Sequence, residues 1–399
     1  MREPFGFEIL ARDGEARCGL LRTPHGPVET PAFMPVATYG AVRGIGPGEL
    51  EAVGAQILLA NTYHLHERPG ETVVAALGGL HAFSGWRRPW LCDSGGFQVT
   101  SLADRVELDE GGVTFRSPLD GQRRRLTPEQ AVAIQEELGA DVAMALDECR
   151  APAPPPGPPG SAATLATRAA MERTLRWAER CRRAHRRRET ALFGIVQGGS
   201  SESLRRASAR GTAALEFDGY AHGGLGLGEA PEARGALIAA VHAELPAQAP
   251  RYAMGIGRPE DVLDAVAAGV DLFDCVLPTR NGRHGVLYTS EGVLRVTNAR
   301  FRDDPEPPDP ACDCPTCRHH SRAYLCHLLR TGEMLGARLA SLHNLRFYLR
   351  LLEEARRAIA AGTLASLRGR SLRSCVLRSR GSAVGDASRE TKKRKERPR

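Results

Sequence analysis

The chain has 399 residues, of which 42% are hydrophobic and 25% charged, an ordinary globular mixture with enough length for a large core. The first ten residues turn polar at once, unlike a signal peptide, and no apolar run approaches the roughly 20 residues of a membrane span. The ten cysteines are scattered without framework spacing, which is typical of free thiols. We therefore expect a cytoplasmic protein with no membrane segment.

The formal net charge of +7 lies in the last segment of the chain. Residues 371–399 hold ten Lys and Arg against three Asp and Glu, whereas residues 1–370 hold 44 of each sign. A neutral body can bind nucleic acid only through a local basic face. We expect residues 371–399 to form a basic, disordered tail. The tail is either an accessory RNA-binding arm or a solubilising end, and the sequence leaves both open.

Short apolar runs recur along the chain, and each is followed by a segment with helix signals. The predicted strands are Pro31–Val36, Gln56–Ala60, Pro89–Cys92, Val142–Leu146, Ala191–Val196, Tyr220–Leu225, Arg251–Ile256 and a run from Val270 that ends at Asp274. Strands that alternate with helices indicate a parallel sheet, and eight repeats favour an α/β fold of the (β/α)8 TIM barrel type. A doubly wound open sheet is the alternative, but no G-x-G-x-x-G fingerprint follows an early strand.

Capping patterns mark where two of the helices begin. Thr127-Pro128-Glu129 combines an N-cap with Pro at the first helical position and an acid in the first turn. Arg258-Pro259-Glu260-Asp261 begins another helix in the same way. The proline-rich stretch Pro152–Gly160 cannot be helix or central strand, so we expect a loop after the fourth strand.

Polar side chains stand where several of the predicted strands end: Asp93, Asp147, Gln197 and Asp274. In a TIM barrel the carboxyl ends of the strands build the active site, so we expect these side chains to converge. Asp93 and Asp274 suit displacement at a sugar carbon, where one carboxylate attacks and forms a covalent intermediate while the other moves protons. Asp147 and Gln197 can pair with the edge of a purine, and Gly223-Gly224 leaves backbone groups open to the ring.

The last of these carboxylates is followed by an arginine loop. After Asp274 the chain breaks at Pro278 and reaches Arg280 and Arg283. A carboxylate on a rigid strand, with arginines that can meet an anion just outside it, is a common layout for a catalytic site. The alternative is an aspartate that caps a strand end near surface arginines.

A separate unit is expected between Ala311 and His343. Cys312, Cys314 and Cys317 form a short knuckle that can bring three thiolates within about 2.3 Å of one zinc ion. His343 can supply the fourth ligand of a closed tetrahedral site, which is the structural kind. The competitors for the fourth position are His319, His320, Cys326 and His327.

A helix from about Ser321 to Ala361 is expected to carry many arginines. Together with Arg280, Arg283, Arg295, Arg300 and Arg302, these arginines form a candidate basic face beside the eighth strand. The alternative is a solvated helix face with i,i+4 pairs such as Arg350 with Glu354.

Several motifs follow one another in a fixed order: DSGGFQ at 93–98, FGIVQGG at 193–199, GGL at 223–225, YAMGIG at 252–257, FDCVLPTR at 273–280 and the C-x-C-x2-C…His set at 312–343. In order and spacing they resemble the bacterial tRNA-guanine transglycosylases of the queuine tRNA-ribosyltransferase family, over about residues 5–365. The resemblance implies a (β/α)8 TIM barrel with an inserted C-terminal zinc-binding subdomain, one structural Zn²⁺ per subunit and a homodimer. It implies exchange of the anticodon wobble guanine of GUN-anticodon tRNAs for 7-aminomethyl-7-deazaguanine (prequeuine), by covalent double displacement in queuosine biosynthesis.

The resemblance also implies a role for each candidate residue. The nucleophile that attacks ribose C1′ is Asp274, and the general acid/base is Asp93. The residues implied to bind the base are Asp147, Gln197, Gly224 and Leu225, with Phe97 and Met254 stacking on it. The residues implied to read the anticodon neighbour of the exchanged base are Arg280 and Arg283, assisted by Arg258. The implied zinc ligands are Cys312, Cys314, Cys317 and His343.

Base choice within the family depends on pocket size. Cys149 and Leu227 resemble the bulky choices of bacterial members, which exclude the larger queuine. The Leu225 carbonyl, with Glu229 behind it, can accept from the ammonium of the 7-aminomethyl base. Two positions depart from the family pattern: Leu227 replaces the usual valine, and His284 replaces an asparagine near the expected tRNA contact.

The expected organisation is a catalytic barrel domain over residues 1–370, which includes a zinc-binding subdomain at 300–350, followed by the tail. Three alternatives remain: a transglycosylase that uses another 7-deazaguanine base, a non-catalytic tRNA-binding paralogue and a zinc-dependent barrel hydrolase. Intact Asp93 and Asp274 argue against the paralogue. A closed Cys₃His site argues against the hydrolase, because catalytic zinc needs an open position.

Overall fold

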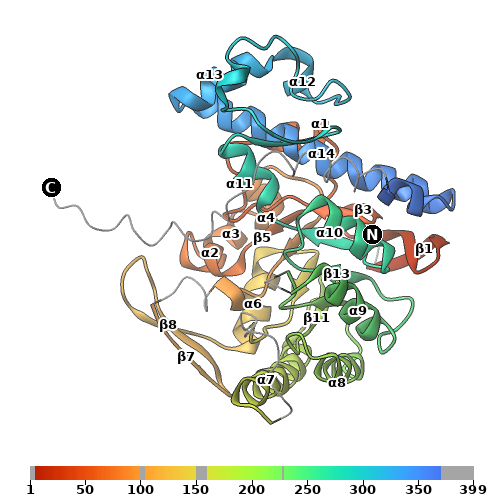
Figure 1. Cartoon of the computed structure of the whole chain (residues 1–399). Helices are drawn as coiled ribbons and strands as arrows, with labels where there is room; N and C mark the ends of the chain where they lie inside the picture. Colours follow the sequence, from red (N-terminus) through yellow and green to blue (C-terminus); the bar gives the residue numbers. More distant parts are fainter. Residues whose placement is uncertain (1–4, 99–103, 150–159, 227–228, 370–399) are drawn as a thin grey trace.

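A closed parallel barrel forms the centre of the protein in a computed structural model, which describes residues 5–98, 104–149, 160–226 and 229–369 (Figure 1). Its strands are β4 (Ala32–Met34), β5 (Leu58–Ala60), β6 (Trp90–Cys92), β10 (Val142–Met144), β11 (Ala191–Val196), β12 (Gly219–His222), β13 (Arg251–Ala253) and β14 (Leu272–Asp274). The sheet order is β4-β14-β13-β12-β11-β10-β6-β5, with every pair parallel. A parallel bridge between Val36 and Leu59 joins the two ends of the sheet. The predicted barrel and its eight strands are confirmed.

The barrel strands are buried on both faces, as their continuous apolar runs predicted. Every residue of β11 is buried. Ala191, Phe193 and Ile195 belong to the cluster of the barrel interior, whereas Leu192 and Val196 belong to the cluster that includes the surrounding helices. This alternation is the period of two that a strand imposes on its side chains.

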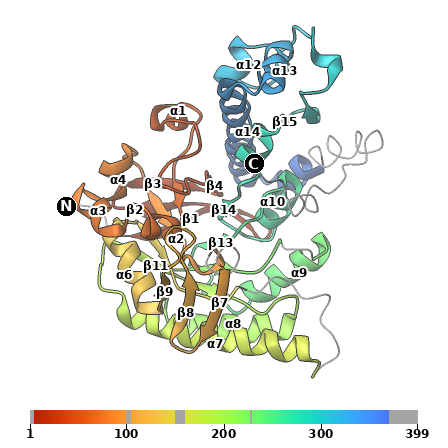
Figure 2. The same cartoon turned by 90° about the vertical axis from the view of Figure 1, so that its left-hand side faces the viewer.

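Helices surround the barrel (Figures 1 and 2). They are α1 (Pro47–Ala52), α2 (Thr62–Glu67), α3 (Glu71–Ala76), α4 (Gly79–Ser84), α6 (Pro128–Leu138), α7 (Ala162–Ala184), α8 (Glu202–Ala213), α9 (Pro231–His242), α10 (Pro259–Ala267) and α11 (Leu277–Arg283). Both predicted helix starts are confirmed: Thr127 caps α6 through a capping box with Gln130, and α10 begins at Pro259.

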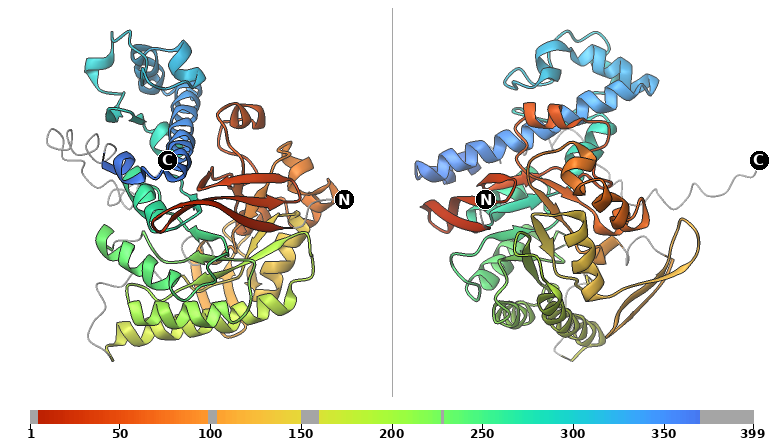
Figure 3. Two further views of the ribbon diagram at one scale, coloured as in Figure 1. Left: turned by 90° about the vertical axis from the view of Figure 1, so that its right-hand side faces the viewer. Right: turned by 180° about the vertical axis from the view of Figure 1, so that it is seen from behind.

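Three small antiparallel sheets were not predicted from the sequence. They contain β1 (Gly6–Asp13), β2 (Ala16–Thr23) and β3 (Gly26–Thr30); β7 (Asp104–Asp109), β8 (Gly112–Arg116) and β9 (Arg123–Leu126); and β15 (Val286–Thr289) with β16 (Gly292–Arg295). The β1–β3 sheet lies across one end of the barrel (Figure 3). Leu21 on β2 and Val28 on β3 pack in the same cluster as the barrel interior, so this sheet closes the amino-terminal end of the barrel.

The C-terminal unit contains η1 (Ala299–Phe301), α12 (Pro315–His319), α13 (Arg322–Thr331) and α14 (Met334–Ala360). The single helix expected from about 321 to 361 is therefore two helices. The break falls at Gly332, whose φ of 77° ends α13 in a left-handed cap. α14 packs against α11, β1 and β2, and so ties the C-terminal unit to the barrel.

Parts of some expectations lie outside the described residues: the proline-rich loop except Gly160, Leu227, and the tail 371–399. Among the described residues, no helix is both long enough and apolar enough to cross a bilayer.

Candidate active site and metal cluster

The four polar residues predicted at strand ends stand at one end of the barrel. Asp93 follows β6, Asp147 and Gln197 come after β10 and β11, and Asp274 is the last residue of β14. Because all eight strands are parallel, these positions share the carboxyl-terminal end. That is the end at which TIM-barrel enzymes build their active sites.

The Asp93 carboxylate is held by donors from the ends of two neighbouring strands. The backbone N–H groups of Thr62 and Gly95 donate to Oδ1 at 2.9 and 3.2 Å, and Gln98 Nε2 donates to Oδ2 at 2.8 Å. Asn61 Nδ2 also donates to Oδ2. Asn61 directly follows the second predicted strand, Gln56–Ala60, and no role was predicted for it. A polar residue at a strand end was the signal that could have found it.

Asp274 is held differently, through one oxygen. Tyr252 Oη donates to Oδ1 at 2.6 Å and Gly255 N donates to the same atom at 2.8 Å. Within the described part of the chain no hydrogen bond reaches Oδ2. An anchored carboxylate with one unengaged oxygen is the arrangement that a nucleophile requires.

The two carboxylates influence each other electrostatically. Burial, together with the negative charge of Asp274, outweighs the lowering effect of the hydrogen bonds and raises the pKa of Asp93 to about 6. Burial also raises the pKa of Asp274. A carboxyl group with a pKa near 6 can both give and take a proton near neutral pH, which suits Asp93 to general acid/base work.

The predicted base-binding residues form a second polar cluster. Gln197 Nε2 donates to Asp147 Oδ2 at 2.7 Å, and Ser94 Oγ donates to Asp147 Oδ1 at 3.3 Å. A Cβ on Gly223 would lie 2.3 Å from Gln197 Nε2, and one on Gly224 would lie 2.8 Å from Gln197 Oε1. Glycine is therefore required here so that the backbone can approach the amide side chain. The structure brings Asp147, Gln197 and Gly224 together as predicted.

The apolar residues near this cluster differ in exposure. Phe97 lies in the helical residues 96–98 that follow Asp93, with 46% of its surface exposed, and Met254 is partly buried. The Leu225 side chain packs in the core, so only its backbone can face a ligand. The stacking of Phe97 and Met254 on a base stays a prediction.

Of the two residues expected to form the pocket wall, Cys149 lies among the described residues and Leu227 lies outside them. The Cys149 thiol interacts with Gln197 and with the backbone of Gly224, and burial raises its pKa to about 12, so it is a neutral group. Glu229 accepts from Gly226 N at 2.5 Å and from Arg234 Nε at 2.6 Å.

Arginines gather beside the site. Arg258 and Arg280 are exposed, whereas Arg283 on α11 is partly buried. Burial lowers the pKa of Arg283, and the neighbouring positive charges of Arg43 and Arg280 lower it further. Arg43, in the β4–α1 loop, was missed by the sequence analysis because no local pattern links it to α11. The patch of Arg43, Arg280 and Arg283 is suited to a polyanion.

Several arginines of α13 and α14 form ion pairs with acids. They are Arg322 with Asp304, Arg338 with Glu49, Arg346 with Asp313 and Glu353, Arg350 with Asp309 and Glu354, and Arg356 with Glu29. The i,i+4 pair of the alternative, Arg350 with Glu354, is present at 3.8 Å. The acids offset much of the positive charge of these five arginines, and the basic face of the remaining arginines stays a prediction.

The C-terminal cysteines and His343 form one buried cluster. Their ligand atoms all lie within 4.8 Å of one another, and His343 Nδ1 is 3.2 Å from Cys317 Sγ and 3.7 Å from Cys314 Sγ. His343 Nε2 donates to the backbone oxygen of Tyr288 at 2.8 Å, which leaves the Nδ1 lone pair for a metal. Among the described residues, the competing histidines and Cys326 are not part of this cluster. A Cys₃His set of this kind fits a closed structural metal site.

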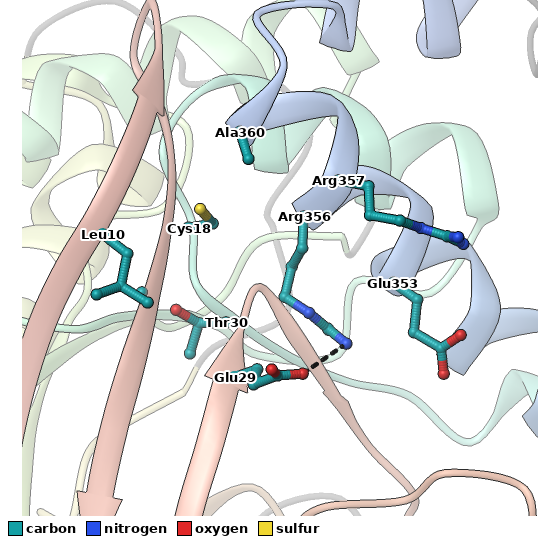
Figure 4. Close-up of a pocket in the computed structure, with 9 residues that line it drawn as sticks. Leu10, Cys18, Glu29, Thr30, Glu353, Arg356, Arg357 and Ala360 are labelled. Carbon is teal, nitrogen blue, oxygen red and sulfur yellow. Dashed lines mark ion pairs between the residues drawn. The ribbon is translucent and has the colours of Figure 1, made fainter.

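A hollow of about 440 Å³ lies away from these residues, between the β1–β3 sheet and α14 (Figure 4). Arg356 forms an ion pair with Glu29 across it, at 3.3 Å. Thr30, at its rim, precedes β4 and so marks the amino-terminal end of the barrel. This hollow is not part of the candidate active site.

Comparison with known proteins agrees with the geometry. A sequence model described as queuine tRNA-ribosyltransferase matches residues 13–375. The queuine tRNA-ribosyltransferase of Thermus thermophilus is 54% identical over 360 residues, which cover 90% of this chain and 91% of the relative. The queuine tRNA-ribosyltransferase of Nitrosomonas europaea is 54% identical over 356 residues, which cover 89% of this chain and 94% of the relative. The chain therefore belongs to the queuine tRNA-ribosyltransferase family.

Proposed function

We propose that the chain is a tRNA-guanine transglycosylase of queuosine biosynthesis, which exchanges the wobble guanine of GUN-anticodon tRNAs for 7-aminomethyl-7-deazaguanine. The observation that carries the proposal is the pair Asp93 and Asp274 at the carboxyl-terminal end of the barrel. Asp274 is anchored through a single oxygen, and Asp93 has a pKa of about 6. Such a pair suits a double displacement at a sugar carbon.

In the first step, Oδ2 of Asp274 attacks ribose C1′ and the bond from C1′ to guanine N9 breaks. Asp93 gives its proton to the departing guanine. In the second step Asp93 takes the corresponding proton from the incoming base, whose ring nitrogen attacks C1′ and releases Asp274. Two displacements restore the original configuration at C1′, and each proton that Asp93 gives is returned to it.

The cluster of Asp147, Gln197 and Gly224 supports recognition of a purine-like base. A carboxylate accepts hydrogen bonds, and an amide both donates and accepts, so together they can match an amino-pyrimidinone edge. The backbone carbonyl of Leu225 accepts a hydrogen bond from the ammonium group of the 7-aminomethyl base. Cys149 limits the pocket on one side, and Phe97 and Met254 stack on the base. A base inside the anticodon must be turned out of the RNA to enter.

The arginine patch supports an RNA substrate. Arg280 and Arg283 read the anticodon neighbour of the exchanged base, Arg258 assists them, and Arg43 extends the positive surface toward the tRNA backbone. The Cys₃His cluster holds one structural Zn²⁺, which stabilises the C-terminal unit that packs against α11. The functional unit is a cytoplasmic homodimer of chains, each with a catalytic domain over residues 1–370 and a zinc-binding subdomain at 300–350.

Exchange of labelled guanine into a GUN-anticodon tRNA, with and without the 7-aminomethyl base as competitor, tests the proposal. Wild type should incorporate the label, and the competitor should block it. Asp274→Asn should bind tRNA but neither exchange base nor form a covalent RNA–protein adduct, because the amide cannot act as a carboxylate nucleophile. Substantial exchange by this variant would refute the assignment. Exclusion of the 7-aminomethyl base alongside use of another 7-deazaguanine would refute only the base choice.

A further inference from the structure

A second cluster of metal-type side chains lies at the opposite, amino-terminal end of the barrel. His25 is in the β2–β3 turn, His81 is on α4, and Asp141 immediately precedes β10. His25 Nδ1 lies 2.8 Å from Oδ1 of Asp141, and His81 Nε2 lies 3.1 Å from Oδ2. The Asp141 side chain has no exposed surface, so two imidazoles from distant parts of the chain meet at one buried carboxylate.

The spacing of these atoms fits a single ion. All three ligand atoms lie within 4.8 Å of one another. In a tetrahedral site with metal–nitrogen bonds of about 2.0–2.1 Å, neighbouring ligand atoms are roughly 3.3 Å apart. The separations of 2.8 and 3.1 Å are hydrogen-bond lengths, one to each oxygen of Asp141, and they lie only a few tenths of an ångström below that spacing.

We propose that His25, His81 and Asp141 form a second metal site, which takes a divalent transition-metal ion such as Zn²⁺. Imidazole nitrogen with carboxylate oxygen is a donor set that suits such ions. A neutral imidazole coordinates through a lone pair, so its one proton moves to the other ring nitrogen when the ion enters. The ion and one carboxylate leave a single positive charge on the site.

The surroundings leave room for a fourth ligand. A hollow of about 300 Å³ adjoins His25 and Asp141, and its lining includes Arg187, Glu189 and Thr190. Water from this hollow can complete the coordination, and the carboxylate of Glu189 adds negative charge at its rim. Arg187 opposes the cation, but it is exposed and can extend into solvent.

One side chain must turn for the lone pairs to converge. The two imidazole rings are stacked, with centroids 3.4 Å apart and planes 19° from parallel. His25 is the ring that can move, because 20% of its side chain is exposed and it stands on a hairpin turn. The side chain of His81 is only 9% exposed. The bound ion would tie the sheet that closes the barrel to α4 and β10, far from the exchange chemistry.

Metal content and thermal stability test the site in the full-length protein. The variant His25→Gln keeps an N–H donor for Asp141 but loses the imidazole ligand, which separates coordination from hydrogen bonding. Arg187→Ala is the matched control, since it changes the same hollow without removing a ligand. Each protein is loaded with excess Zn²⁺, desalted and analysed for bound metal, and its melting temperature is measured before and after loading.

Wild type and Arg187→Ala should hold two ions per chain, and His25→Gln should hold one. Metal loading should raise the melting temperature of wild type more than that of His25→Gln, because an ion that binds only the folded chain stabilises it. A titration with Co²⁺ should show one equivalent with thiolate charge-transfer absorption and one without it. One ion per chain in wild type, or two in both wild type and His25→Gln, would overturn the proposal.

Discussion

Tyr252 Oη donates a hydrogen bond of 2.6 Å to Oδ1 of Asp274, and this bond orients the carboxylate at the end of β14. Tyr252 lies on the neighbouring strand β13 and is 1% exposed. Burial, and then the charge of Asp274, raise the pKa of Tyr252 well above its ordinary value, so the phenol stays a donor at any pH of interest. A rigid neighbouring strand thus fixes one carboxylate oxygen and leaves the other to react.

Tyr252→Phe should slow base exchange with little effect on tRNA binding. A hydrogen bond to a charged group contributes roughly 1.5–3 kcal/mol, so we expect kcat to fall roughly 10- to 100-fold. Single-turnover exchange and the KM for tRNA measure the two effects separately, and a melting curve verifies folding. An unchanged kcat in a folded variant would show that the Tyr252 hydroxyl does not position the nucleophile.

Asp93→Asn should change the pH dependence of stability as well as abolish exchange. The folded-state pKa of Asp93, about 6, lies above its ordinary value, so Asp93 favours the folded state at low pH. This stability is lost as the pH rises through the folded-state pKa. The variant minus wild-type difference in unfolding free energy should therefore increase between about pH 4 and pH 8, by at most roughly 3 kcal/mol. Denaturant unfolding at several pH values measures it, and a flat difference would contradict the raised pKa.

Arg43→Ala should weaken tRNA binding by removing one positive charge from the patch around Arg283. The loss of affinity should be greatest at low salt. A plot of log affinity against log salt concentration should become shallower by roughly one unit of slope. Arg88→Ala is the control, because Arg88 is an exposed arginine just before β6, at the other end of the barrel. Equal losses in both variants would show that Arg43 has no special position on the tRNA surface.

Cys317→Ala should lose the structural metal and loosen the C-terminal unit, since metal binding at such a site is coupled to folding. The effect should reach α11, because Asn344, next to the ligand His343, donates to the Pro278 and Val286 backbone oxygens at 2.9 Å. We expect a lower melting temperature and a higher KM for tRNA. Cys326→Ala, which removes a buried thiol outside the cluster, should keep its metal. Wild-type zinc content and stability in Cys317→Ala would contradict the ligand assignment.

Local patterns in the sequence determined the barrel and the main residues of its site. Continuous apolar runs marked the eight strands, because strands buried on both faces need no polar alternation. Asp93, Asp147, Gln197 and Asp274 were recognisable because each comes directly after such a run or ends it. The spacing of Cys312, Cys314 and Cys317 was also informative, because in so short a segment the local backbone brings the three thiolates close together.

Only the tertiary structure decided which groups from distant parts of the chain meet. His343 rather than its competitors faces the three cysteines, because Tyr288 and α14 hold it there. Arg43 lies beside Arg283, and His25 and His81 meet at Asp141, although no sequence pattern links these positions. The pKa values of the carboxylates were likewise decided by the tertiary structure. The sequence shows which carboxylates are present, but their ionisation free energies depend on burial and on neighbouring charges. Both of these depend on how the whole chain packs.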